Sequence, residues 1–160
     1  MIKIFTIGVY NSTEDSFFAK LKNNNIDLFC DIRQRRGVRG ALYKYVNSNY
    51  LQQKLEELNI KYQYIKELAP TNEIRQKQKD VDKYNGESKK ERHILGSVFT
   101  FEYNKQILNN FNIDTLINEF ENIKAQNIVF FCVEEYASAC HRSLVAKKIA
   151  EKLNCEIINL

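Results

Sequence analysis

The strongest chemical signal in this sequence is a short segment that carries two thiols, a carboxylate, an imidazole and a guanidinium. These side chains are Cys132, Glu134, Cys140, His141 and Arg142. The apolar run at 127–133 predicts a buried strand, and a helical period begins at Cys140. The start of a helix favours negative charge, so it would stabilise a Cys140 thiolate and hold an anion beside Arg142. The segment predicts phosphate, carboxylate or thiolate chemistry, with Glu134, Cys140 and His141 as catalytic residues.

The same side chains have two other interpretations. Cys132 and Cys140 could be small core residues, with His141 as a capping side chain. Cys132, Cys140 and His141 are also zinc-type ligands, for which Glu134 or Cys30 would be a fourth. Adjacent residues seldom bind one ion together, and no short Cys-x-x-Cys pair is present. We therefore predict no metal here, and the lack of a glycine-rich dinucleotide or phosphate-binding loop predicts no cofactor.

A second cluster is the arginine-rich stretch 33–39, which holds four of the seven arginines and no acidic residue. The net charge is +4, so the basic and acidic residues of the remaining chain balance. A planar guanidinium binds phosphate or carboxylate in a bidentate manner, which lysine does not. A solvated basic turn is the alternative. The possible nucleic-acid contacts are Arg35, Arg36, Arg39 and Tyr43.

Alternating strand and helix patterns must position these residues. Strands are predicted at 2–7, 26–32, 60–65, 127–133 and 155–158, and helices after residue 13, from residue 47 or 48, and over 71–83, 101–111, 114–124 and 140–153. This order predicts an α/β fold with a mostly parallel sheet of about five strands, flanked by helices on both faces. Ligands of such sheets bind at the carboxyl ends of the strands. We therefore expect Gly8, Asp31, Arg33 and Arg142 to bind the substrate or anion there.

Length and composition set the class of protein. A chain of 160 residues with 44% hydrophobic and 28% charged residues predicts one globular domain, 1–160, rather than a disordered or fibrous chain. A polar stretch around 70–100 predicts a mobile helical and loop insertion. The sequence shows neither a secretion signal nor an apolar run of membrane-spanning length. We expect a cytoplasmic protein with reduced cysteines and no membrane partner.

The motifs Thr6-Ile7-Gly8, Asp31-Ile32-Arg33, Glu67-Leu68-Ala69-Pro70, Cys132-Val133-Glu134 and Cys140-His141-Arg142-Ser143 occur in this order. This order resembles the domain-of-unknown-function 488 family of small prokaryotic proteins, over nearly the whole chain. The resemblance implies an α/β domain with a shared polar pocket, and it implies no reaction, because the family is named for lacking one. The pocket residues that it implies are Asp31, Arg33, Glu134, Cys140, His141 and Arg142. Val9-Tyr10 replaces a common His-Ser pair, which removes a titratable group.

Two functions follow from these patterns. The first is an enzyme acting on an anionic, phosphate-bearing substrate, either a small anion or a nucleotide. Its layout is similar to that of rhodanese sulfurtransferases and cysteine phosphatases, although the loop 132–142 is several residues longer than theirs. The alternative is a nucleic-acid or nucleotide-binding module that uses the Arg33–Arg39 loop. A binding module has no use for Glu134 beside Cys140 and His141, so we favour the enzyme; the oligomeric state stays open.

Overall fold

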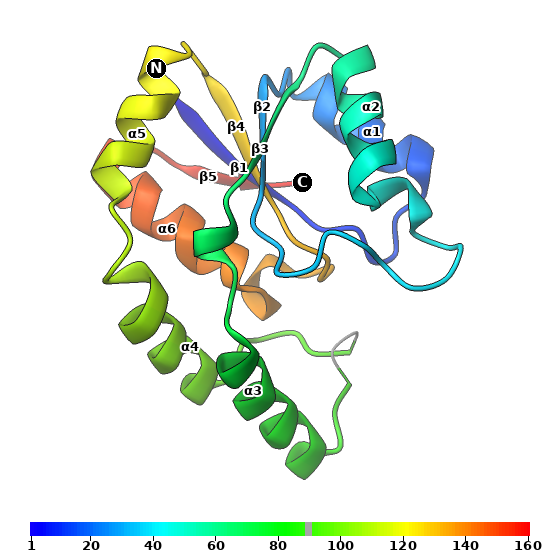
Figure 1. Cartoon of the computed structure of the whole chain (residues 1–160), viewed down its shortest axis with the longest axis vertical. Helices are drawn as coiled ribbons and strands as arrows, with labels where there is room; N and C mark the ends of the chain where they lie inside the picture. Colours follow the sequence, from blue (N-terminus) through cyan, green and yellow to red (C-terminus); the bar gives the residue numbers. More distant parts are fainter. Residues whose placement is uncertain (89–90) are drawn as a thin grey trace.

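The computed structural model describes residues 1–88 and 91–160, and its centre is a five-stranded sheet in which every pair of neighbouring strands is parallel (Figure 1). The strands are β1(Lys3–Ile7), β2(Leu28–Asp31), β3(Lys61–Tyr64), β4(Asn127–Phe131) and β5(Ile157–Asn159). Their order across the sheet is β3-β2-β4-β1-β5. The predicted α/β class and strand number are confirmed.

Helices cover both faces of this sheet. They are α1(Glu14–Asn23), α2(Ser48–Glu57), α3(Asn72–Asn85), α4(Ser97–Tyr103), α5(Ile113–Asn122) and α6(His141–Leu153). Neighbouring strand residues point to opposite faces, and each face has its own core. Phe5 and Phe29 pack in the core that includes residues of α1 and α2, whereas Ile4 and Leu28 pack in the core that includes residues of α4, α5 and α6. Figure 1 shows the α1–α2 pair and the α5–α6 pair on opposite sides of the strands.

Local hydrogen bonds explain where several helices begin. Thr13 caps α1 through a reciprocal bond with Ser16, and Thr71 accepts from the backbone of Ile74 at the start of α3. Asn47 stands at the N-cap of α2, as the sequence predicts, but makes no side-chain cap bond there. Its side-chain oxygen instead accepts from the Val38 N–H at 2.7 Å. Asn47 thereby ties the arginine-rich loop to α2.

Some boundaries differ from the sequence prediction. Strand β4 ends at Phe131, so Cys132 belongs to the following loop. The helix expected at 101–111 begins earlier, at Ser97, and continues from α4 into the π-helical turn η3(Asn104–Leu108). The expected insertion around 70–100 contains α3 and the start of α4, while residues 89 and 90 of it lie outside the described residues. Its mobility stays a prediction.

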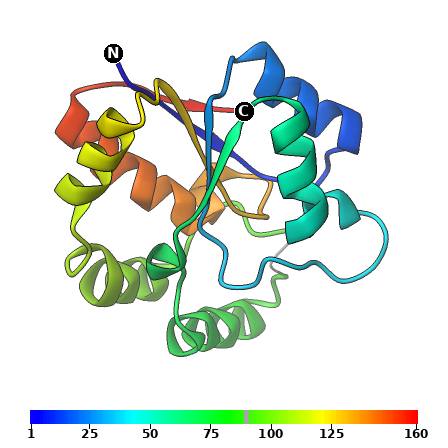
Figure 2. The ribbon, with the colours of Figure 1, turned by 45° about the horizontal axis from the view of Figure 1, so that its top comes forward.

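The loops that leave the carboxyl ends of β1, β2 and β4 gather on the side of the sheet nearest α3 (Figure 2). The Val9 and Tyr10 N–H groups both donate to the Val133 carbonyl, at 3.1 and 3.0 Å. The Ser48 N–H donates to the Arg36 carbonyl at 3.0 Å. The first two bonds join the loops after β1 and β4, and the third ties the loop after β2 to the start of α2. No helix within residues 1–88 and 91–160 has the length and apolarity needed to cross a membrane.

Candidate active site

A cavity of about 530 Å³ opens where these loops meet, and residues of α3 form part of its wall. Its cationic lining residues are Arg33, Arg35, Arg39, Arg75, Lys79 and Arg92. Its acidic lining residues are Asp82 and Glu134. Both tyrosines of the Tyr10–Tyr43 ring pair, with centroids 5.4 Å apart, also line it. The wall is therefore strongly cationic, with one aromatic patch.

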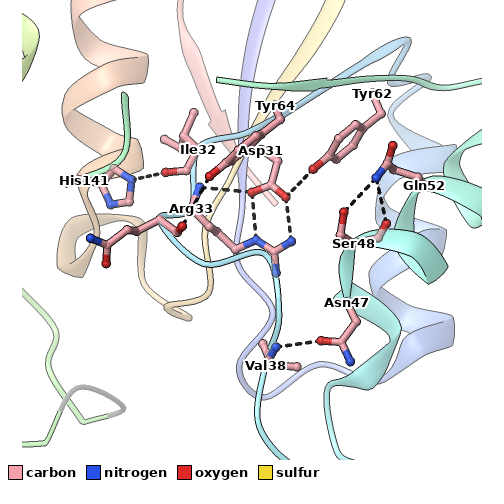
Figure 3. Close-up of polar contacts among 11 residues, drawn as sticks. Asp31, Ile32, Arg33, Val38, Asn47, Ser48, Gln52, Tyr62, Tyr64 and His141 are labelled. Carbon is pink, nitrogen blue, oxygen red and sulfur yellow. Dashed lines mark hydrogen bonds and ion pairs between the residues drawn. The ribbon is translucent and has the colours of Figure 1, made fainter. Parts of the chain in front are cut away.

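Arg33 is held rigidly in this wall by Asp31 (Figure 3). Its Nε donates to Asp31 Oδ1 at 2.9 Å and its Nη2 to Asp31 Oδ2 at 2.7 Å, and the guanidinium stacks over the Phe131 ring at 4.7 Å. Asp31 is fully buried and also accepts from the Tyr62 hydroxyl at 2.9 Å. Burial and the Asp31 charge raise the pKa of Tyr62 to about 12, so it stays a donor.

One nitrogen of Arg33 is left over by this arrangement. The Nη1 atom is buried and has no hydrogen-bond partner within the described part of the chain. Figure 3 shows it pointing away from Asp31. A buried N–H without an acceptor costs about 1–3 kcal/mol. Because Arg33 lines the cavity, an anion bound there could accept this hydrogen bond.

Two thiols and an imidazole lie together on the cavity floor. The Cys140 Sγ lies 3.7 Å from His141 Nδ1, and the Cys132 Sγ lies within 4.8 Å of both atoms. On the other side of the ring, His141 Nε2 donates to the Ile32 carbonyl at 2.9 Å (Figure 3). A carbonyl can only accept, so in the neutral ring Nε2 carries the proton and Nδ1 presents its lone pair to the thiols.

The surroundings of this floor raise the pKa values of the Cys132 thiol and of the His141 imidazole. A hydrogen bond with Cys140, followed by burial, raises the pKa of the Cys132 thiol well above its ordinary value. Burial lowers the pKa of His141, but the interactions of its ring with Cys132, Glu134 and the Ile32 carbonyl outweigh this effect, and the net shift is upward. The imidazole is therefore a good acceptor for a thiol proton.

The bend at the start of α6 brings Cys140 and His141 together. Cys140 is the N-cap residue, with extended backbone angles of φ −137° and ψ 143°, and His141 is the first helical residue. The Ser143 side chain donates to the Cys140 carbonyl at 2.9 Å, which holds the bend in place. Adjacent side chains usually diverge, but this change of backbone direction makes the thiol and the imidazole converge.

Gly8 and Arg142 do not line the cavity, although the sequence predicts both as anion-binding residues. Arg142 is buried, and its Nη1 and Nη2 donate to the carbonyls of Glu134 and Glu135 at 2.6 and 3.0 Å. A Cβ atom on Gly8 would lie 1.9 Å from the Glu134 carbonyl oxygen. Both residues therefore shape the loop that places Glu134 at the cavity.

The four expected nucleic-acid contacts do not share one surface. Arg35, Arg39 and Tyr43 line the cavity, and both arginines are exposed. Arg36 does not line it; its guanidinium stacks over the Tyr64 ring at 4.4 Å instead. A hydrogen bond with Tyr62 raises the pKa of Arg36 further. The arginine-rich loop therefore contributes two exposed cations to the cavity and one to a neighbouring face.

Sequence reasoning missed the wall that comes from α3 and the segment after it. Arg92 donates to Asp82 at 2.8 Å and to the Ala139 carbonyl at 3.2 Å, and its Nη2 lies 3.8 Å from Glu134 Oε1. Gln78 donates to Asp82 at 2.6 Å. Ile74, Gln78 and Asp82 are the buried residues of α3, and their spacing of four places them on one helix face. The spacing of four could have identified Gln78 and Asp82 from the sequence, whereas no sequence pattern indicates the position of Arg92.

Comparison with known proteins gives one match. A family model described as "Domain of unknown function DUF488" matches residues 13–149 of the chain. The matched range contains Asp31, Arg33 and the whole floor cluster, and it begins after Gly8. No curated protein and no solved structure matches significantly.

Proposed function

We propose that the chain, which belongs to the DUF488 family, is an enzyme acting on an anionic, phosphate-bearing small molecule bound in the cavity. Membership of this family leaves the activity open. The observation that carries the proposal is the pairing of a cationic wall with a thiol–imidazole floor in one cavity. A volume of about 530 Å³ falls in the usual range for small-molecule sites.

The anion-binding part of the proposal rests on Arg33, Arg35 and Arg39. Arg33 is fixed by Asp31 and stacked on Phe131, so little side-chain entropy is lost when its Nη1 donates to a ligand. Arg35 and Arg39 are exposed and can close over a phosphate from the arginine-rich loop. The cavity thus offers one rigid donor and two adaptable ones.

The aromatic patch narrows the class of substrate. Tyr10 and Tyr43 line the cavity beside the cations, and the Tyr43 hydroxyl is fixed because it accepts from the Asn11 N–H at 2.9 Å. Aromatic side chains bind planar rings by stacking, at about 1–3 kcal/mol per base. The phosphates of a nucleotide can bind the cations and its base can stack on the tyrosine rings, so we favour a nucleotide over a simple phosphate.

The chemical step is assigned to Cys140, His141 and Glu134. His141 Nδ1 can accept the Cys140 thiol proton, while Nε2 keeps its hydrogen bond to Ile32 and holds the ring in place. The resulting thiolate faces a ligand bound by Arg33, because both residues line the cavity. Glu134 lines the same cavity and can transfer a proton to or from the substrate.

The test compares three arginines of the same loop. Arg35→Gln and Arg39→Gln each remove a cation that lines the cavity, and Arg36→Gln removes a neighbouring one that does not. Calorimetric titration with pyrophosphate and with AMP should show roughly fivefold or greater weakening in the first two variants. The Arg36→Gln variant should bind as the wild type does.

The alternative function, a nucleic-acid or nucleotide-binding module, is favoured by one observation: Arg36 stacks on Tyr64 outside the cavity. An extended strand could contact it together with Arg35 and Arg39. In that case the three arginine variants would lose affinity for single-stranded DNA equally, and Cys140→Ser would change nothing. Unequal losses, with Arg36→Gln unaffected, favour the cavity and the enzyme.

A further inference from the structure

We infer that Cys132, Cys140 and His141 form a binding site for a thiophilic divalent metal ion, zinc in the first place, on the floor of the cavity. All three residues are buried, and their ligand atoms lie within 4.8 Å of one another. The inference deepens the proposed function, because it identifies what the floor binds, but the ligand geometry stands without any assumption about the substrate.

The distances between the ligand atoms suit tetrahedral coordination. Bond lengths of about 2.3 Å to sulfur and about 2.0 Å to nitrogen imply S···N separations of roughly 3.5 Å and S···S separations of roughly 3.8 Å. The observed separation of Cys140 Sγ from His141 Nδ1 is 3.7 Å, and every pair in the cluster lies within 4.8 Å. A contraction of about 1.3 Å or less, within the range of small side-chain rotations, therefore completes the three protein ligands.

The His141 ring is oriented as a metal-binding histidine is. Ligating histidines usually donate their other ring N–H to a carboxylate or a backbone carbonyl, which fixes the tautomer. His141 Nε2 makes this bond to Ile32, directly after β2 (Figure 3), and Nδ1 lies 3.7 Å from Cys140 Sγ. The ring therefore needs no reorientation to bind an ion.

The donor set selects the kind of ion and the kind of site. Two thiols and an imidazole favour zinc and similar soft or borderline ions over magnesium or calcium. Within the described residues no carboxylate completes the cluster, and the fully buried Cys30 is not part of it. Three protein ligands beside a cavity leave one position for solvent or substrate, as in catalytic rather than structural zinc sites.

Binding would change the role of Cys140. Each thiol loses its proton to solvent as its sulfur becomes a thiolate ligand, so the ion's two positive charges are balanced by the two sulfurs. With the ion bound, Cys140 would be a ligand rather than a nucleophile. The ion would supply a Lewis acid that activates solvent, and Glu134 lines the same cavity and could accept a proton. The arginine wall keeps its role in holding the anion.

The experiment uses the full chain, purified in a reducing buffer after growth with added zinc. We expect about one zinc per chain by elemental mass spectrometry. After removal of zinc, titration with cobalt(II) alone should give the sulfur-to-cobalt charge-transfer band and the intense visible bands of a tetrahedral site. Cys132→Ser and Cys140→Ser should each weaken cobalt binding at least tenfold. Cys155→Ser, the same change outside the cluster, should leave it unchanged.

A measurement on the wild type guards against variants that fold poorly. Zinc should slow alkylation of Cys132 and Cys140 by iodoacetamide, mapped by mass spectrometry, and should leave Cys155 unaffected. Zinc-free protein with a featureless cobalt spectrum, or cobalt binding that survives both cluster substitutions, would overturn the inference. The proposed anion site is tested separately, because pyrophosphate binding to the Arg39→Gln variant is measured on the metal-free chain and does not depend on the thiols.

Discussion

Replacing Asp31 with asparagine tests whether Arg33 is held as the structure indicates. The carboxylate is fully buried and accepts from the Arg33 Nε, Nη2 and backbone N–H groups and from the Tyr62 hydroxyl, at 2.7–3.2 Å. The amide of asparagine has one acceptor oxygen and no charge. Asp31→Asn therefore leaves a buried guanidinium with neither its counter-charge nor its bidentate partner.

The size of the effect follows from this burial. Removing one partner of a buried ion pair costs about 3–5 kcal/mol, a large part of the roughly 5–15 kcal/mol by which a domain of this kind is stable. The sequence alone predicts that Asp31→Asn weakens anion binding and leaves the fold intact. The structure adds a large loss of stability. Anion affinity should therefore be measured on the fraction that remains folded.

Urea denaturation, followed by far-ultraviolet circular dichroism, measures this loss. The control is Asp114→Asn, which breaks the exposed pair with Lys152, where the side chains are 68% and 42% exposed. Exposed pairs contribute about 0–1 kcal/mol, so the control should be nearly neutral. Asp31→Leu combined with Arg33→Met should be less destabilising than Asp31→Asn alone, because it removes both charges. A free-energy change for Asp31→Asn within about 1 kcal/mol of the control would show that the buried Asp31–Arg33 pair does not stabilise the fold.

Two further predictions concern stability. Gly8→Ala places a Cβ atom 1.9 Å from the Glu134 carbonyl oxygen and should reduce the free energy of unfolding by about 3 kcal/mol or more. In the control Gly37→Ala, the nearest atom to the new Cβ is 3.8 Å away, and the free energy of unfolding should change by less than about 1 kcal/mol. Equal changes in the two variants, measured by denaturation, would contradict the close packing at Gly8. Burial raises the pKa of the Cys30 thiol in the folded chain well above its ordinary value. As the pH rises, the unfolded chain therefore loses this proton before the folded chain does, and the free energy of unfolding falls above the unfolded pKa of about 8.5. Cys30→Ala should reduce that alkaline slope by up to about 1.4 kcal/mol per pH unit in denaturation curves, and an unchanged slope would show that the thiol is not desolvated.

Much of the fold follows from the sequence because it depends on local signals. Alternating apolar strands and capped helices predict the parallel α/β sheet, and the strand-end rule predicts that Arg33 and the 132–141 segment meet. The capping role of Thr13 is likewise a local property of the chain. These features need only the order of residue types and their period.

The roles of individual arginines could not be predicted, because they depend on tertiary contacts. Arg142 follows a Cys-His pair and resembles an anion ligand in sequence, yet both of its terminal nitrogens donate to backbone carbonyls. Arg92 lies in a polar stretch and reaches the cavity only because α3 packs beside the loops. The approach of Cys140 to His141 depends in the same way on the backbone bend at the start of α6.

Binding of a phosphate-like anion by the rigidly held Arg33 is the basis of the proposed function. Its most direct test is a crystal structure of the full chain soaked with tungstate, a phosphate analogue that is located by its anomalous scattering. We expect an anomalous peak in the cavity within hydrogen-bonding distance of Arg33 Nη1, which in the structure is buried without an acceptor among the described residues. Tungstate bound only at exposed lysines, with the cavity filled by solvent, would contradict anion binding by Arg33.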